Sequence, residues 1–178
     1  GVQFHLDSRI DEILYSDGMV KGVTCAGQMH ECDIIVSNMD VHFTYEKLLP
    51  GLKGPQRVLK QEKSTSAIVF YWGIRKSFDQ LDVHNIFFSK DYEGEFNSIS
   101  LNKTLSDDPT VYIHISSKME KEDAPEGCEN WFVMVNAPID TGQDWRIQKQ
   151  QLRANVIRKL DRLLHEDIAP LIEVEEDL

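Results

Sequence analysis

The chain has 178 residues, of which 28% are charged and 41% hydrophobic, a composition typical of globular proteins. Its formal net charge of −11 argues against a nucleic-acid partner, because phosphate binding draws its affinity from lysine and arginine. No apolar run reaches the roughly 18 residues of a membrane span, and the first residues lack a signal-peptide pattern. Three cysteines, few and odd in number, favour a reducing compartment, so the expected location is cytoplasmic.

The first forty residues predict a β-meander. Apolar and polar residues alternate in residues 2–6, and two further short strands are expected around a tight turn at Asp17-Gly18. The run Ile34-Ile35-Val36 is apolar on both faces of a strand, which predicts that it enters the middle of a buried sheet. Residues 40–50 then predict a short helix that Asp40 caps, and a second short helix begins at Pro55.

From Thr65 onward the pattern changes to pairs of strands, each followed by a helix. This order predicts an α+β fold, in which helices cover one face of a mainly antiparallel or mixed sheet. The longest helix is expected over residues 144–168, with a last strand near the end of the chain. Four leucine and valine residues at helical spacing form its core-facing stripe: Leu152, Val156, Leu160 and Leu163.

The predicted strands are rich in aromatic residues. In residues 66–74, Phe70 and Trp72 share one face, while Val69 and Tyr71 point to the other. If helices cover only one face, the other must meet a neighbouring domain, a partner or an apolar ligand, although core packing on both faces remains an alternative. The candidates for an apolar pocket on the face away from the long helix are Phe70, Trp72, Phe88, Tyr112 and Phe132.

An ordered series of short motifs in residues 1–50 carries a family resemblance. It includes a strand ending in "SNMD" at residues 37–40 and a helix "TYEKLLP" at residues 44–50. Later stretches, such as "HNIFFSKDYEGEFNSI" and "IRKLDRLLHEDI", follow in the family's order. The chain resembles the central portion of the phytoene desaturase family of FAD-dependent oxidoreductases, which belongs to the amine-oxidase-like flavoprotein group.

The resemblance implies a division of the chain by function. Residues 1–40 would be the last part of a flavin-domain segment, and residues 41–178 a truncated substrate-binding domain. The glycine-rich turn G-x-G-x-x-G, which binds the FAD pyrophosphate in such folds, does not occur here, so the fragment alone is expected to be inactive. In related flavoproteins a residue at the position of Ile10 contacts the FAD adenine through its main chain, and the resemblance carries that role to Ile10.

The implied function is desaturation of a carotenoid or isoprenoid by a flavin. A saturase, an isomerase or an amine oxidase on the same fold, and a free-standing binding module with an apolar sheet face, are the alternatives. The implied partner is a lipophilic substrate, and both a homodimer and a peripheral membrane location of the intact enzyme are compatible with it. His42 and His114 are titratable side chains that could approach the flavin or face a pocket, with a helix-surface or sheet position as the alternative. The sequence assigns no catalytic residue and no metal site.

Overall fold

The computed structural model describes all of residues 1–178. By internal contacts the chain divides into two compact units, residues 1–62 and residues 63–178. Both contain an antiparallel sheet accompanied by short or long helices, which confirms the predicted α+β class. The predicted boundary at residues 40/41, between a flavin-domain segment and a substrate-binding domain, was assigned by function. It differs from the boundary between the compact units and stays a prediction.

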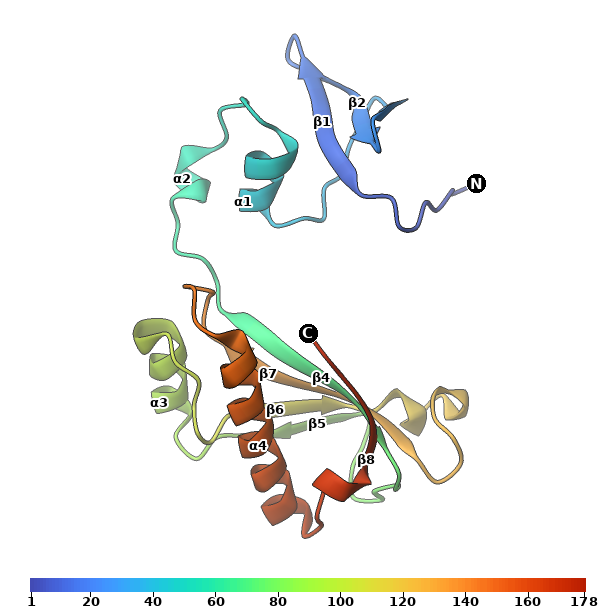
Figure 1. The fold of residues 1–178 in the computed structure, drawn as a ribbon, viewed down its shortest axis with the longest axis vertical. Helices are drawn as coiled ribbons and strands as arrows, with labels where there is room; N and C mark the ends of the chain where they lie inside the picture. Colours follow the sequence, from blue (N-terminus) through green and yellow to red (C-terminus); the bar gives the residue numbers. More distant parts are fainter. The chain divides into compact units, whose positions relative to one another are not determined.

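The first unit contains a three-stranded antiparallel meander (Figure 1). Its strands are β1 (Ile10–Ser16), β2 (Met19–Cys25) and β3 (Gln28–Glu31), paired in the order β1-β2-β3. The turn between β1 and β2 needs positive φ angles at both of its central residues, and Asp17 and Gly18 adopt 53° and 76°. The predicted meander is therefore confirmed.

Two strands expected in this unit do not form. Residues 1–9 have no regular structure apart from a turn, and Ile34 and Val36 are 82% and 90% exposed outside any strand. A strand buried on both faces needs neighbours at both edges and cover on both faces, and in the first unit the only sheet is the meander β1-β2-β3, which does not include residues 34–36. The prediction of a buried strand at residues 34–36 is wrong for this structure, in which Ile34 and Val36 are exposed and Ile35 is half-buried.

Short helices follow the meander. Helix α1 (Val41–Phe43) continues into a π-helical turn, Thr44–Leu48, and α2 covers Gln56–Leu59. As predicted, Asp40 caps α1, because its side chain accepts a hydrogen bond of 2.8 Å from the backbone N–H of His42.

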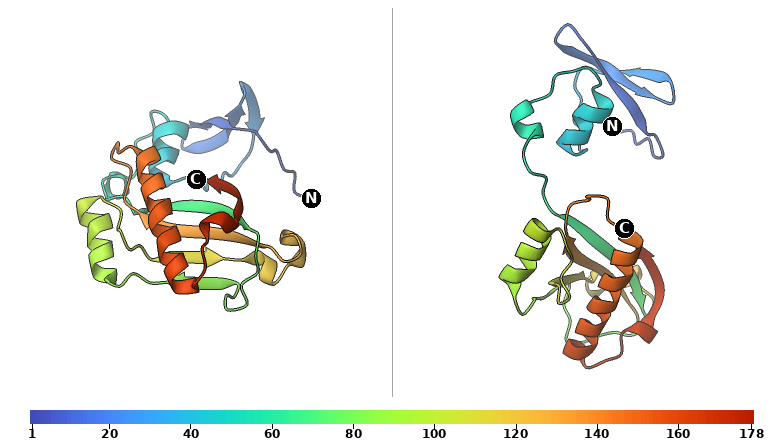
Figure 2. Two further views of the ribbon diagram at one scale, coloured as in Figure 1. Left: turned by 60° about the horizontal axis from the view of Figure 1, so that its bottom comes forward. Right: turned by 60° about the vertical axis from the view of Figure 1, so that its left-hand side comes forward.

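The second unit is built on a five-stranded antiparallel sheet with the order β5-β6-β7-β4-β8 (Figures 1 and 2). Every pair of neighbouring strands in it is antiparallel. The strands are β4 (Ser66–Ile74), β5 (His84–Phe87), β6 (Val111–His114), β7 (Glu129–Ala137) and β8 (Ile172–Asp177).

Helix α4 (Trp145–Leu164) lies across one face of this sheet (Figures 1 and 2). Asp144 caps it, since its carboxylate accepts from the backbone N–H groups of Arg146 and Ile147. Three residues of the predicted stripe are buried in the core, while Leu163 is 44% exposed and Leu164 takes its place. The remaining helical segments are α3 (Tyr92–Asn97), a π-helical turn (Ser98–Asn102) and three 3-10 turns (Ser116–Lys118, Lys121–Asp123 and Ala169–Leu171).

Candidate functional site

The two faces of the five-stranded sheet are buried to different degrees. Along β4 and β7, alternate residues are fully buried and the residues between them are half-buried or exposed. The buried set packs against the apolar stripe of α4, so the helix covers that face. The other face, called the open face below, has no helix of this unit across it.

The structure corrects the predicted placement of two aromatic residues. Phe70 and Trp72 were expected on the face away from the long helix, but they are 2% and 1% exposed in the core on the α4 side. Their rings stack on each other at 5.6 Å between centroids. The physical reason is that this face of β4 carries the larger apolar area, whereas Val69, Tyr71 and Gly73 on the open face offer the helix less to bury.

One register row crosses all five strands on the open face. His84 of β5 lies opposite His114 of β6, and His114 lies opposite Phe132 of β7. Phe132 in turn faces Tyr71 of β4, which faces Glu176 of β8. The rings contact along the row: the centroids of His84 and His114 are 5.1 Å apart, and those of Tyr71 and Phe132 are 5.5 Å apart. We call these five residues the open-face row.

A second, mostly apolar row lies beside the first. Tyr112 of β6 is its centre, flanked in register by Ile86 and Met134, with Val69 beyond Met134. The Tyr112 ring packs edge-on against Phe132 at 6.4 Å, and its hydroxyl is 2.8 Å from Nδ1 of His84. Tyr112 and Phe132, both predicted from sequence, are therefore brought together on this face.

A hollow of about 460 Å³ opens along the open face. It has side chains of four neighbouring strands in its walls, and it combines aromatic surface with a few polar groups. Its lining residues are Tyr71, Trp72, Gly73, His114, Asn130, Trp131, Phe132, Val174 and Glu176. Tyr71 and His84 also belong to this face, although neither is among the predicted pocket residues. No local sequence signal places them beside Phe132, because the three residues lie on different strands and meet only through the register of the sheet.

Phe88 lies outside this surface. It follows the end of β5, its side chain is 62% exposed, and its ring packs edge-on against Tyr92 of α3 at 5.7 Å. The structure thus brings together two of the five predicted aromatic residues, and it places the other three in the core or beside α3.

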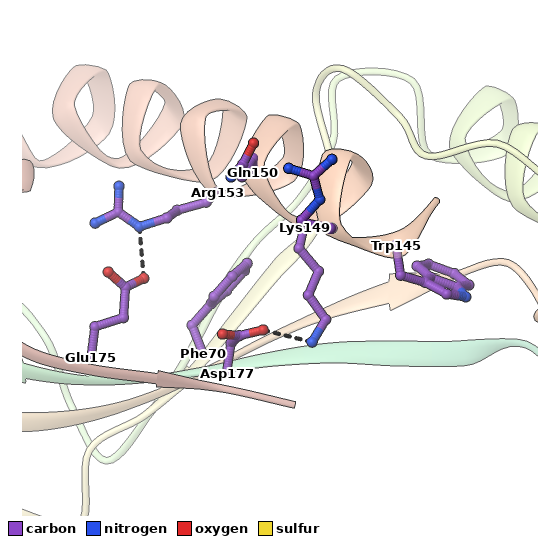
Figure 3. Close-up of a pocket in the computed structure, with 8 residues that line it drawn as sticks. Phe70, Trp145, Lys149, Gln150, Arg153, Glu175 and Asp177 are labelled. Atoms are coloured by element: carbon purple, nitrogen blue, oxygen red, sulfur yellow. Dashed lines mark hydrogen bonds and ion pairs between the residues drawn. The ribbon is translucent and has the colours of Figure 1, made fainter. Parts of the chain in front are cut away.

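A second hollow, of about 590 Å³, lies between α4 and the edge strand β8 (Figure 3). Two ion pairs connect its walls: Lys149 Nζ lies 2.6 Å from Asp177 Oδ2, and Arg153 Nε lies 2.6 Å from Glu175 Oε1 (Figure 3). Phe70 contributes to its lining. Four of the charged groups in this hollow are thus paired with one another, and they join the helix to the strand.

The charge state of Glu175 follows from its contacts. Burial by itself raises the pKa of this carboxyl, but hydrogen bonds from Arg153 and from the indole N–H of Trp72 outweigh burial and lower the pKa below its usual value. Glu175 is therefore ionised at neutral pH. The carboxylate joins β8 both to α4 and to the core.

Ile10 lies in the first unit, at the start of β1 and half-buried. It lines a small hollow of about 260 Å³ whose walls also carry charged side chains. The other lining residues are Arg9, Asp11, Met39, Lys47 and Leu48. The adenine contact that the resemblance implies for Ile10 stays a prediction.

Among the helices of the structure, none has the length and apolarity that crossing a membrane requires. No group of three or more His, Cys, Asp or Glu side chains is placed to hold a metal ion.

Comparisons with known proteins point to one group of relatives. The chain is 50% identical over 175 residues to a 1-hydroxycarotenoid 3,4-desaturase from a Flavobacterium species, a match that covers 98% of this chain and 36% of that protein. It is 30% identical to a phytoene desaturase of Fusarium fujikuroi and to a zeta-carotene-forming phytoene desaturase of Myxococcus xanthus, each over 98% of this chain. The chain spans about a third of the length of these curated relatives.

The fold has a counterpart among solved structures. An oxidoreductase from Methanosarcina mazei superposes with a TM-score of 0.53 at 10% identity, over 96% of this chain and 36% of that one. At this identity the likeness concerns the fold alone. No protein-family model matches the chain.

Proposed function

The chain belongs to the phytoene desaturase family as a segment about a third as long as its relatives, and from this premise we propose that it is the substrate-contacting part of a longer carotenoid desaturase. The reaction proposed for the longer protein is the removal of hydrogen across a C–C bond of a lipophilic isoprenoid. The observation that carries the proposal is the 50% identity to a carotenoid desaturase over nearly the whole chain.

The open face suits such a substrate physically. A carotenoid-like chain offers almost no hydrogen bonds, so its affinity must come from buried apolar area, at about 25 cal/mol per Å². Phe132, Tyr71, Tyr112 and Met134 present such area on neighbouring strands, and aromatic side chains contribute large contact area from few rotatable bonds. Burial of the substrate against this face would also exclude water from the reacting bond.

FAD is the proposed hydride acceptor, and it supplies the redox chemistry when bound. The residues of this chain do not by themselves fit the whole cofactor, because the glycine-rich turn that approaches a pyrophosphate is not among them. The proposed contribution of this chain to FAD binding is the main chain of Ile10, whose N–H and C=O can form hydrogen bonds with the edge of the adenine. Binding of the rest of the cofactor is assigned to the longer protein.

The test compares two proteins. The 178-residue chain is expected to purify colourless, and the longer protein encoded by the complete reading frame is expected to contain FAD and to desaturate a carotenoid. The measurement is release of flavin by denaturation, with identification by chromatography, followed by a product assay. Stoichiometric FAD in the 178-residue chain, or a longer protein without flavin and without desaturation, would contradict the proposal and favour a free-standing binding module.

A further inference from the structure

A glycine occupies one position of the open face on β4. The residues of β4 that point to this face alternate with the buried ones, and Gly73 is the last of them. In register, Gly73 lies between Asn130 of β7 and Val174 of β8, one row away from the pair Tyr71 and Phe132. All of these residues line the hollow of about 460 Å³. The hollow therefore includes a position that has no side chain, between neighbours that do.

The backbone at Gly73 does not require glycine. Its φ angle lies outside the positive range that L side chains rarely adopt. The β4–β8 register is irregular beside it, but the extra residue is Glu173 of β8 and not Gly73. Glycine in the interior of a strand also costs stability, because it loses more conformational freedom on folding than any other residue. Its presence here needs another reason.

Packing within this chain does not require glycine either. A Cβ atom built on Gly73 would have its three nearest neighbours in a single residue, Val174, whose own Cβ would lie 3.3 Å away. Val174 is on the edge strand β8 and is 62% exposed, so its side chain has room to give way. An alanine at position 73 therefore fits the folded chain, and what it changes is the space in the hollow.

We propose that Gly73 is a specificity-determining residue, which keeps the hollow open for the methyl-branched apolar chain of the substrate. This inference rests on the proposed function and deepens it, because it assigns the part of the open face that the substrate enters. An isoprenoid carries a methyl branch on each isoprene unit, so it is wider than an unbranched hydrocarbon and fits a recess better than a flat sheet. The rings of Tyr71 and Phe132, in edge-on contact at 5.5 Å, lie beside this recess.

A side chain at position 73 would act directly on substrate binding. It would occupy volume that the branched chain needs, and well-packed contacts tolerate extra methylene groups poorly. It would also hold the substrate away from the aromatic surface of Tyr71 and Phe132, which reduces the apolar area buried on binding. Dispersion contacts weaken steeply as a gap opens, so even one added methyl group should be measurable.

The experiment uses the full-length flavin-loaded enzyme, its variants Gly73→Ala and Gly73→Val, and three acyclic carotenoids as probes: phytoene, zeta-carotene and 1-hydroxylycopene. The readout is kcat/KM per bound flavin for each probe that the unmodified enzyme desaturates. Gly73→Val is expected to lower kcat/KM by about tenfold or more, and Gly73→Ala by at least about twofold, since one methylene group in an apolar pocket discriminates to this order. The thermal unfolding midpoint of Gly73→Ala is expected to stay unchanged or to rise, because alanine loses less conformational freedom than glycine.

Ala67→Val is the matched control. It places a valine on the same face of β4 but outside the lining of the hollow, and it is expected to leave kcat/KM unchanged. Equal losses in Gly73→Val and Ala67→Val, no loss in either Gly73 variant, or a lower unfolding midpoint in Gly73→Ala would overturn the role of Gly73 while leaving the proposed function intact. An unmodified enzyme that desaturates none of the three probes would instead overturn the proposed function, and this inference with it.

Discussion

Replacing Trp72 by alanine is expected to lower the free energy of unfolding by about 3–5 kcal/mol, the usual cost of deleting a fully buried aromatic ring. Trp72 is 1% exposed and its ring stacks on Phe70. Its indole N–H also donates a hydrogen bond of 2.8 Å to Glu175 Oε1, so the substitution removes one of the contacts that hold β8. Chemical denaturation of the 178-residue chain measures the change.

The neighbouring residue is the control for this prediction. Tyr71 is 40% exposed on the open face, where it packs edge-on against Phe132. Tyr71→Ala is expected to cost less than about 1.5 kcal/mol, the upper range of an aromatic pair. If Tyr71→Ala destabilised the fold as much as Trp72→Ala, the assignment of the two faces of β4 would be reversed.

Glu129→Ala is expected to destabilise the second unit by about 3–5 kcal/mol, because it breaks a buried charged network. Glu129 is 2% exposed, and its carboxylate lies 2.7 Å from Lys118 Nζ. It also accepts hydrogen bonds of 2.8 Å from the backbone N–H of Phe78 and from the indole N–H of Trp131. Loss of the carboxylate leaves both N–H groups unpaired away from water and the Lys118 ammonium without its counter-charge.

Two further variants make the Glu129 prediction specific. Glu129→Gln keeps the shape and some of the hydrogen bonds but removes the charge, so its effect should lie between those of the parent and Glu129→Ala. Glu126→Ala removes an exposed carboxylate nearby in sequence and should change the free energy of unfolding by less than about 0.5 kcal/mol. Equal effects of Glu129→Ala and Glu126→Ala in thermal or chemical denaturation would contradict the role of this network.

The order of elements was predictable because its signals are local. Asp17-Gly18 specifies a tight turn wherever it lies, and Asp144 caps α4 through the backbone N–H groups that follow it. The expected strand at residues 34–36 failed because burial on both faces depends on distant neighbours, which a local apolar run does not specify. The strand predicted at residues 2–6 does not form either, since an alternating pattern of apolar and polar residues does not by itself provide a partner strand.

The candidate site was only partly predictable for a related reason. Strand parity separates Phe70 and Trp72 from Tyr71, but it does not say which set the helix covers. The open-face row also depends on register across strands that are far apart in sequence. His84 and His114 meet because β5 pairs with β6, and no local pattern indicates that their rings stack.

Contact between the open face and a carotenoid is the central claim, and photo-crosslinking in the full-length enzyme measures it most directly. A photoreactive benzoylphenylalanine replaces Phe132 on the open face or, as the control, Ile147, which is 56% exposed on α4. After irradiation with carotenoid, mass spectrometry is expected to find the adduct at position 132 and none at position 147. Labelling at position 147 with none at position 132 would contradict the account.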